Sequence, residues 1–243
     1  MYLLNYVHAS VYFLVVCGSY YAAYVHRSLI SIPFSIALGW ALFGLVTVGH
    51  DCMHGTFSPY PRLNAALSFV CLNCIVMPND VWQQEHSFHH SNPGAPDDHM
   101  ILDGGNFFGE IKHLLCSPHK TKWTQELAKL PLVVLLMLLP LYCVPIVWLA
   151  TLMSFAYLSL TTHIVTPNIR EMDHTKPKAA EDIAVNIFPG SQVYCLLAGG
   201  LNLHAPHHEN PRWTRSQLIH EAKDTRYKSI NTWSEFWSLL QRR

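Results

Sequence analysis

Long apolar runs constrain this chain more than any other feature of its sequence. Residues Leu3 to Val25 and Leu29 to Val48 are each long enough to cross a bilayer core, because about 20 helical residues span about 30 Å. The chain is 50% hydrophobic and 13% charged, with zero formal net charge and a mean hydropathy of +0.16. These values predict an integral membrane protein and give no indication of nucleic-acid binding.

Eight of the 16 histidines are concentrated in three short motifs. GHDCMHGT carries His50 and His54, whose spacing places both rings on one side of a helix. HSFHH and HAPHH share a second spacing and contain His86, His89, His90, His204, His207 and His208. Histidine is costly to bury unless both ring nitrogens find partners. Since single metal sites take about four to six ligands, eight histidines predict two metal ions.

Two further apolar segments determine the topology. Leu63 to Met77 is shorter, is followed by Pro78, and is expected to lie in the membrane or to dip into it. Leu130 to Val165 is interrupted by Pro140 and Pro145, which favours a hairpin of two arms over one tilted helix. One crossing would separate the second and third histidine motifs, whereas two crossings bring them to the same side of the bilayer. The hairpin also returns its own histidine, His163, to that side as a ninth ligand.

The basic residues agree with this arrangement. Of the 16 Lys and Arg residues, only Arg27 falls in a loop on the far side of the bilayer. The positive-inside rule therefore places both termini and all three motifs on the cytoplasmic side. We predict an all-α, multi-pass protein with four transmembrane helices, in which residues 79–129 and 166–243 form one helical cap. Residues 1–243 are predicted to form a single domain.

The motifs resemble the three histidine boxes of the integral-membrane fatty acid desaturase and hydroxylase superfamily. The resemblance is carried by GHDCMHGTF, by WQQEHSFHHSNPGAPDDHM with its loop rich in Pro, Gly and Asp, and by AGGLNLHAPHHENPRW. It extends along nearly the whole chain. It implies four transmembrane helices topped by a cytosolic cap that holds two irons, and it matches His163 to the family's histidine on the last transmembrane helix.

The resemblance also implies an activity and its requirements. The enzyme would use O₂ and two electrons at a non-haem di-iron centre to desaturate a fatty acyl chain carried by a lipid or acyl substrate. The predicted metal ligands and catalytic residues are His50, His54, His86, His89, His90, His163, His204, His207 and His208. No cytochrome b5 signature such as HPGG is present, so electrons are expected from a separate ferredoxin or cytochrome b5 type protein.

Five carboxylates near these motifs could orient the histidine rings by accepting their N–H groups. They are Asp51, Glu85, Asp97, Asp98 and Glu209.

The same motifs are compatible with other functions. Ser159 stands where acyl-CoA desaturases have an asparagine, and HHENP stands where many acyl-lipid desaturases have HHLFP. HDCMHGTFSPYPRLNAA also resembles the carotenoid ketolase branch, so ketolation or hydroxylation of a carotenoid ring is an alternative to desaturation. A membrane metal transporter is a weaker alternative, because transport favours ligands distributed through the bilayer depth rather than at helix ends.

Overall fold

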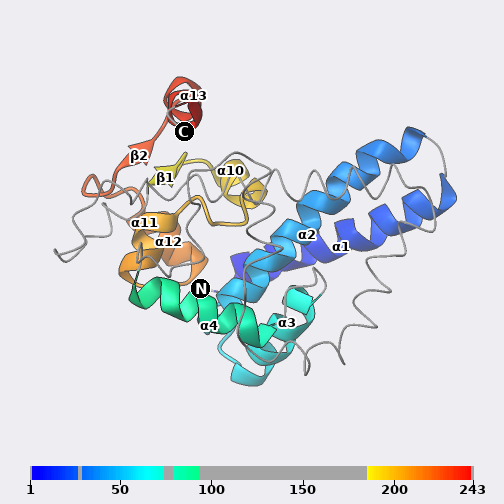
Figure 1. Ribbon diagram of the computed structural model, residues 1–243, viewed down its shortest axis with the longest axis horizontal. Coiled ribbons are helices and arrows are strands. Elements are labelled where there is room, and N and C mark those ends of the chain that lie inside the picture. The colour runs from blue at the N-terminus through cyan, green and yellow to red at the C-terminus, as the bar shows by residue number, and fades with distance from the viewer. Residues whose placement is uncertain (1, 27–28, 74–78, 93–184, 242–243) are drawn as a thin grey trace. The chain divides into compact units, whose positions relative to one another are not determined.

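The computed structural model describes residues 2–26, 29–73, 79–92 and 185–241 (Figure 1). These residues are mostly helical, in agreement with the predicted fold class. The chain divides into two compact units, one made of Met1–Val81 and Lys120–Ser159 and the other of Trp82–His119 and Leu160–Arg243. A single domain over residues 1–243 stays a prediction.

The first unit contains the two long apolar helices. Helix α1 spans Leu3–Val25, the bounds predicted from the sequence, and a short 3-10 helix η1 at Leu29–Ser31 leads into α2 at Ile32–Met53. Both apolar segments have the length and composition of a membrane span. Helix α2 continues beyond Val48, where the predicted apolar run ends, so that His50 lies inside the helix, as its spacing from His54 predicted, and His54 caps its end. The predicted hairpin of residues 130–165 lies outside the described residues.

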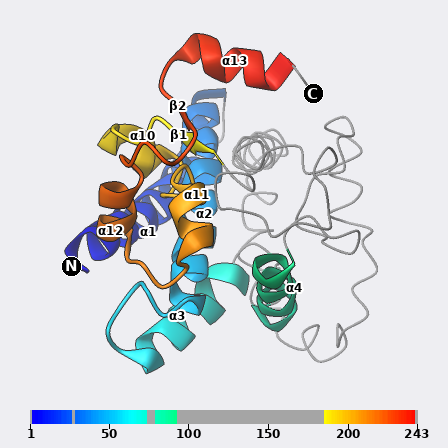
Figure 2. The same cartoon turned by 90° about the vertical axis from the view of Figure 1, so that its left-hand side faces the viewer.

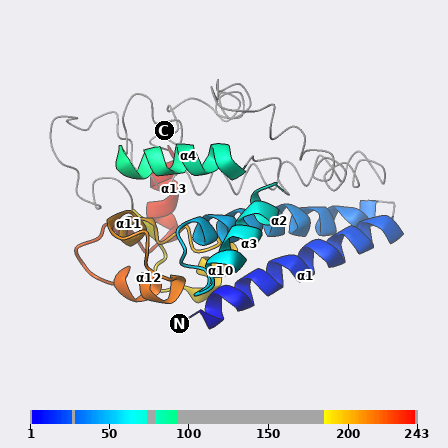
Figure 3. The same cartoon turned by 90° about the horizontal axis from the view of Figure 1, so that it is seen from below.

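Close approach of α1 and α2 depends on a small residue. The two helices lie side by side (Figures 1 and 3), and a Cβ atom at Gly44 would lie 2.3 Å from the ring of Tyr12. Tyr12 is completely buried in this contact. On the opposite side, α1 exposes apolar side chains such as Leu14 and Tyr21. Small residues such as Gly44 let the two helix backbones approach closely.

Gly44→Ala is expected to destabilise the first unit by about 1–3 kcal/mol, because the added methyl group overlaps the buried Tyr12 ring. Gly18→Ala on α1 is the matched control, since a Cβ atom there meets no atom within 4 Å. Thermal unfolding of the detergent-solubilised protein measures the stability of both variants. Equal melting temperatures for the two variants would show that α1 and α2 do not approach at Gly44.

A third helix, α3, spans Pro61–Asn73 and accounts for most of the shorter apolar segment. It packs on α2 at a second small residue, because a Cβ atom at Gly49 would lie 2.7 Å from Leu72. Its place relative to a bilayer stays a prediction.

The second unit holds the remaining elements. Helix α4 at Asn79–Ser91 enters it from Trp82 onward, and it is followed by β1 at Asn186–Ile187, α10 at Gln192–Leu197, α11 at His204–Glu209, α12 at Arg215–Glu221, β2 at Ser229–Ile230 and α13 at Trp233–Gln241 (Figure 2). Strands β1 and β2 pair in parallel, a departure from the all-α prediction within the described residues. Ile187 and Ile230 pack in one core cluster with Val185 and Phe236, which explains why these residues pair. Two-residue strands are too short for hydrophobic periodicity to indicate them.

Candidate metal centre

The second histidine motif lies on one face of α4, as predicted. His86 and His89 are each 3% exposed and His90 is half-buried. The intervening Ser87 and Phe88 are exposed. The helical repeat of 3.6 residues produces this separation, because positions i, i+3 and i+4 share one side of a helix.

The third motif forms the short helix α11, which begins after a tight glycine turn. Gly199 and Gly200 have φ values of +61° and +83°, a backbone conformation that side-chain-bearing residues rarely adopt. A Cβ atom at Gly200 would also lie 2.8 Å from Nε of the buried Arg215. At the start of α11, the backbone N–H of Ala205 donates to Oδ1 of Asn186 at 3.3 Å. These contacts fix where the third motif enters the second unit.

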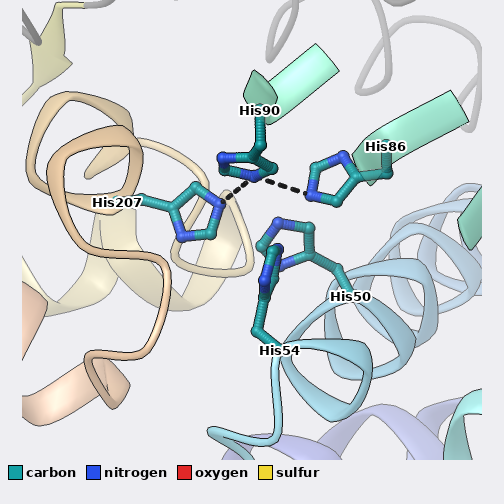
Figure 4. A group of neighbouring side chains, drawn as sticks. All are labelled: His50, His54, His86, His90 and His207. Carbon is teal, nitrogen blue, oxygen red and sulfur yellow. Dashed lines mark hydrogen bonds between the residues drawn. The ribbon is translucent and has the colours of Figure 1, made fainter. Parts of the chain in front are cut away.

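Within this unit, α4 and α11 bring six histidine rings together. His90 Nε2 lies 3.0 Å from His86 Nε2 and 3.1 Å from His207 Nε2, and Figure 4 shows these three rings turned toward one another. We call His86, His90 and His207 the first trio. Their nearest ligand nitrogens all lie within 4.8 Å of one another, so these three side chains could hold one metal ion.

A second trio consists of His89, His204 and His208. His208 Nε2 lies 2.9 Å from His204 Nε2 and 3.1 Å from His89 Nε2. The two trios adjoin, because the ring centroids of His90 and His208 are 4.8 Å apart. The second and third motifs therefore interleave, each contributing to both trios.

The chemistry of these nitrogens fits a metal better than a hydrogen-bonded chain. A ring nitrogen carries either a proton or a lone pair, so His90 Nε2 cannot donate to one neighbour and accept from the other. Nitrogens about 2.1 Å from one ion are about 3.0 Å apart at a ligand angle of 90° and about 3.4 Å apart in a tetrahedron. The observed separations of 2.9 to 3.1 Å are close to these spacings, so neighbouring nitrogens of each trio can bind one ion. Imidazole is a good ligand for iron, copper, nickel and zinc, so iron fits this set.

The first motif lies at the end of α2 in the first unit. His50 is buried, and its ring centroid is 4.7 Å from that of His54 (Figure 4). Asp51 Oδ1 lies 3.1 Å from His50 Nδ1 and accepts its proton, which leaves the Nε2 lone pair of His50 available to a metal. The contact with a histidine ring predicted for Asp51 is thus present, and its orienting role at a metal stays a prediction.

Of the other residues predicted to bind or orient the metals, one makes a different contact and four stay predictions. The carboxylate of Glu209 binds Tyr227 and Arg226 instead of a histidine ring, so the role predicted for it is wrong. Glu85 lies half-buried on α4, and its role stays a prediction. His163, Asp97 and Asp98 lie outside the described residues, and their roles also stay predictions.

Two residues that contact the histidine motifs, Trp82 and Tyr227, were not predicted from the sequence. Trp82 stacks on His86 with ring centroids 4.5 Å apart and an interplanar angle of 11°. Its spacing of four residues from His86 on a helix is the signal that could have identified it. No local pattern connects Tyr227 with the third motif.

Asp51→Ala is expected to weaken metal binding about 10- to 100-fold, because His50 loses the group that fixes its ring and its tautomer. Asp51→Asn is the matched variant: its amide oxygen can still accept the Nδ1 proton, so a smaller loss is expected. Titration of the purified protein with iron(II) measures both. Wild-type affinity in Asp51→Ala would contradict the orienting role.

Known proteins with similar sequences are fatty acid desaturases. A family model described as fatty acid desaturase matches residues 27–237. Among curated proteins, a chloroplastic omega-3 fatty acid desaturase of Brassica napus is 38% identical over 73 residues, which are 30% of this chain and 18% of that protein. A chloroplastic sn-2 acyl-lipid omega-3 desaturase (ferredoxin) of Arabidopsis thaliana is 34% identical over 73 residues, 30% of this chain and 16% of the relative.

An endoplasmic reticulum acyl-lipid omega-3 desaturase (cytochrome b5) of Arabidopsis thaliana is 42% identical over 57 residues, 24% of this chain and 14% of the relative. The matched part of the chain thus spans less than a fifth of each of these three relatives. The family model, in contrast, covers most of the chain. The histidine trios and this match together establish that the chain belongs to the fatty acid desaturase family.

Proposed function

We propose that this protein is a membrane-bound desaturase of fatty acyl chains that holds two iron ions through nine histidines. The convergence of six histidine Nε2 atoms into two adjoining trios is the observation that carries this proposal. Membership of the fatty acid desaturase family supports the reaction class, since its curated relatives are named as desaturases.

The number of ligands suggests how the other histidines are used. Each trio offers three nitrogens, fewer than the six ligands an octahedral iron can take. We propose that His50, His54 and His163 supply the further ligands of the two ions. His50 and His54 lie together at the end of α2 with their rings adjacent, so both can bind the same ion. The two irons would then share nine histidine nitrogens.

Desaturation needs more than acid–base chemistry. Removing hydrogen from an unactivated C–H bond requires an oxidant that no side chain provides, and bound iron with O₂ and two electrons would supply it. Overall, two hydrogens leave neighbouring carbons as a double bond forms, and O₂ is reduced to two waters with two electrons and two protons.

The chain's own residues would have three tasks. Each ligand ring must present a neutral nitrogen lone pair, and Asp51 holds His50 in that tautomer through Nδ1. The burial of His86, His89 and His207 excludes water from these rings. The protein must also hold one pair of acyl carbons beside the irons, because positioning of the reacting atoms determines which bond is oxidised.

The names of the relatives support a class of substrate and a class of electron donor. Two of them are named as acyl-lipid desaturases, one with ferredoxin and one with cytochrome b5. We therefore propose an acyl chain in a membrane lipid as substrate, and a separate ferredoxin or cytochrome b5 type protein as donor.

The proposed topology has four transmembrane helices, with both termini and all histidine motifs on the cytoplasmic side. Accessibility tags placed at Ser28, Asn106 and the C-terminus should report Ser28 outside and the other two positions inside. An external tag at Asn106 would contradict this topology.

Product analysis tests the proposed reaction. Expression in a host that lacks the corresponding desaturase should give acyl chains with one additional double bond, detected by mass spectrometry of their methyl esters. The same host supplied with a carotenoid pathway tests the alternative. Oxidised carotenoid without any new acyl double bond would contradict the proposal and assign the protein to carotenoid oxidation.

A further inference from the structure

Glu209 ends the helix that carries the third histidine motif, and its position is electrostatically unfavourable. The C-terminus of a helix carries partial negative charge, so a carboxylate there is destabilising unless it has partners. Glu209 has two partners from a later part of the chain: it accepts a hydrogen bond from the Tyr227 hydroxyl, and it pairs with Arg226 at 3.1 Å. Glu209 is the Glu of HHENP, the segment that stands where many acyl-lipid desaturases have HHLFP. This difference in sequence therefore corresponds to a contact with Tyr227 and Arg226.

Tyr227 contacts α11 at both of its ends. Its ring packs against the completely buried Ala205 in the first turn, and its hydroxyl donates to Glu209 at the last residue. Tyr227 is only 4% exposed. Burial and the hydrogen bond to Glu209 raise the pKa of Tyr227, so its hydroxyl remains a protonated donor across the physiological range.

Helix α11 needs such support because it is short. A helix of six residues is not stable by itself, since the unfavourable nucleation step is offset by few hydrogen bonds. All three rings of the third motif, His204, His207 and His208, lie within this helix. A small rotation of α11 would separate His207 from His90, whose Nε2 atoms are 3.1 Å apart.

We propose that Tyr227 is a positioning residue for the metal centre, bracing α11 at Ala205 and Glu209 so that the third-motif rings stay in place. This inference rests on the metal centre proposed above. Tyr227 acts through α11 and does not itself bind metal or substrate.

The hydroxyl of Tyr227 matters more here than the charge of Arg226. Arg226 is 44% exposed and also pairs with Glu221 at 3.6 Å and with Asp224 at 3.3 Å. Exposed ion pairs of this kind contribute little, because water and salt screen them. Arg226→Gln is therefore expected to leave metal binding close to that of the wild type.

The test uses purified full-length protein and cobalt(II), whose visible absorption reports ligand geometry. Tyr227→Phe keeps the ring packing and removes only the hydroxyl, and it is expected to weaken cobalt binding about tenfold and to shift the absorption. Amide hydrogen exchange in α11 should become faster, while the melting temperature of the metal-free protein stays unchanged. Tyr194→Phe, which removes a hydroxyl from the aromatic cluster around Phe188, is the matched control.

Variants of Glu209 show whether the hydrogen bond itself is responsible. Glu209→Gln keeps an oxygen that can accept from Tyr227 and should bind cobalt nearly normally, whereas Glu209→Ala should resemble Tyr227→Phe. The double variant should be no weaker than either single one, because both remove the same contact.

The outcomes distinguish this inference from the proposed function. Wild-type protein that binds no cobalt would contradict the metal centre and this inference with it. Normal binding by the wild type and unchanged affinity in Tyr227→Phe would overturn the inference alone. A lowered melting temperature of metal-free Tyr227→Phe with unchanged cobalt absorption would show a merely structural role and would also overturn it.

Discussion

His90→Ala is expected to abolish desaturation and to remove at least one iron. His90 Nε2 is the central nitrogen of the first trio, 3.0 Å from that of His86 and 3.1 Å from that of His207. Its ring also adjoins the second trio at His208, with centroids 4.8 Å apart. A missing ligand at this position cannot be replaced by a more distant side chain. Activity should therefore fall at least about a hundredfold, which is more than is lost when a residue that only hydrogen-bonds a ligand is removed.

The control for this substitution is His220→Ala, which also removes one imidazole from the second unit. The His220 side chain is 85% exposed, and it pairs only weakly with Glu221 at 3.4 Å. Product yield and iron content should be compared at equal membrane abundance, and His220→Ala should match the wild type. Wild-type yield in His90→Ala would refute the assignment of the first trio.

His163→Ala is expected to have the second largest effect. If residues 130–165 form a hairpin, His163 returns to the cytoplasmic surface and adds a ninth ligand to the eight histidines of the three motifs. The variant should lose most of its activity and some of its iron, because the ion that His163 binds is left with too few ligands. Insertion of the chain into the membrane should not change.

Two nearby substitutions are the controls for His163→Ala. Thr161→Ala should be tolerated, and Ser159→Asn should also be tolerated since it restores the residue found in acyl-CoA desaturases. Iron content and product yield are measured for all three at matched abundance. Wild-type values in His163→Ala would show that this residue is not a ligand and would remove the argument for the hairpin.

Strong local periodicity explains what could be predicted from the sequence. The bounds of α1 were predicted correctly because its apolar run is ended by His26 and Arg27. The shared face of His86 and His90 was predicted because helical spacing alone determines it. The meeting of α4 with α11 followed from ligand chemistry, since buried imidazoles need partners and a shared ion provides them.

Contacts between distant residues could not be predicted in this way. Pairing of β1 with β2 depends on burial of Ile187 and Ile230 together, which four residues cannot encode as a pattern. Glu209 was assigned to a histidine ring because it follows His208 in sequence. Adjacency in the sequence does give such a contact between Asp51 and His50, whereas Glu209 binds Tyr227, a residue 18 positions later. The direction of a polar side chain is thus set by tertiary contacts.

Iron content of purified wild-type protein tests the central claim most directly. Elemental analysis of protein expressed with sufficient iron should find about two irons per chain, since each trio serves as the core of one ion's ligand set. Zinc should appear only in place of iron, because imidazole binds both metals. One iron per folded chain, or none, would contradict a centre built from two adjoining histidine trios.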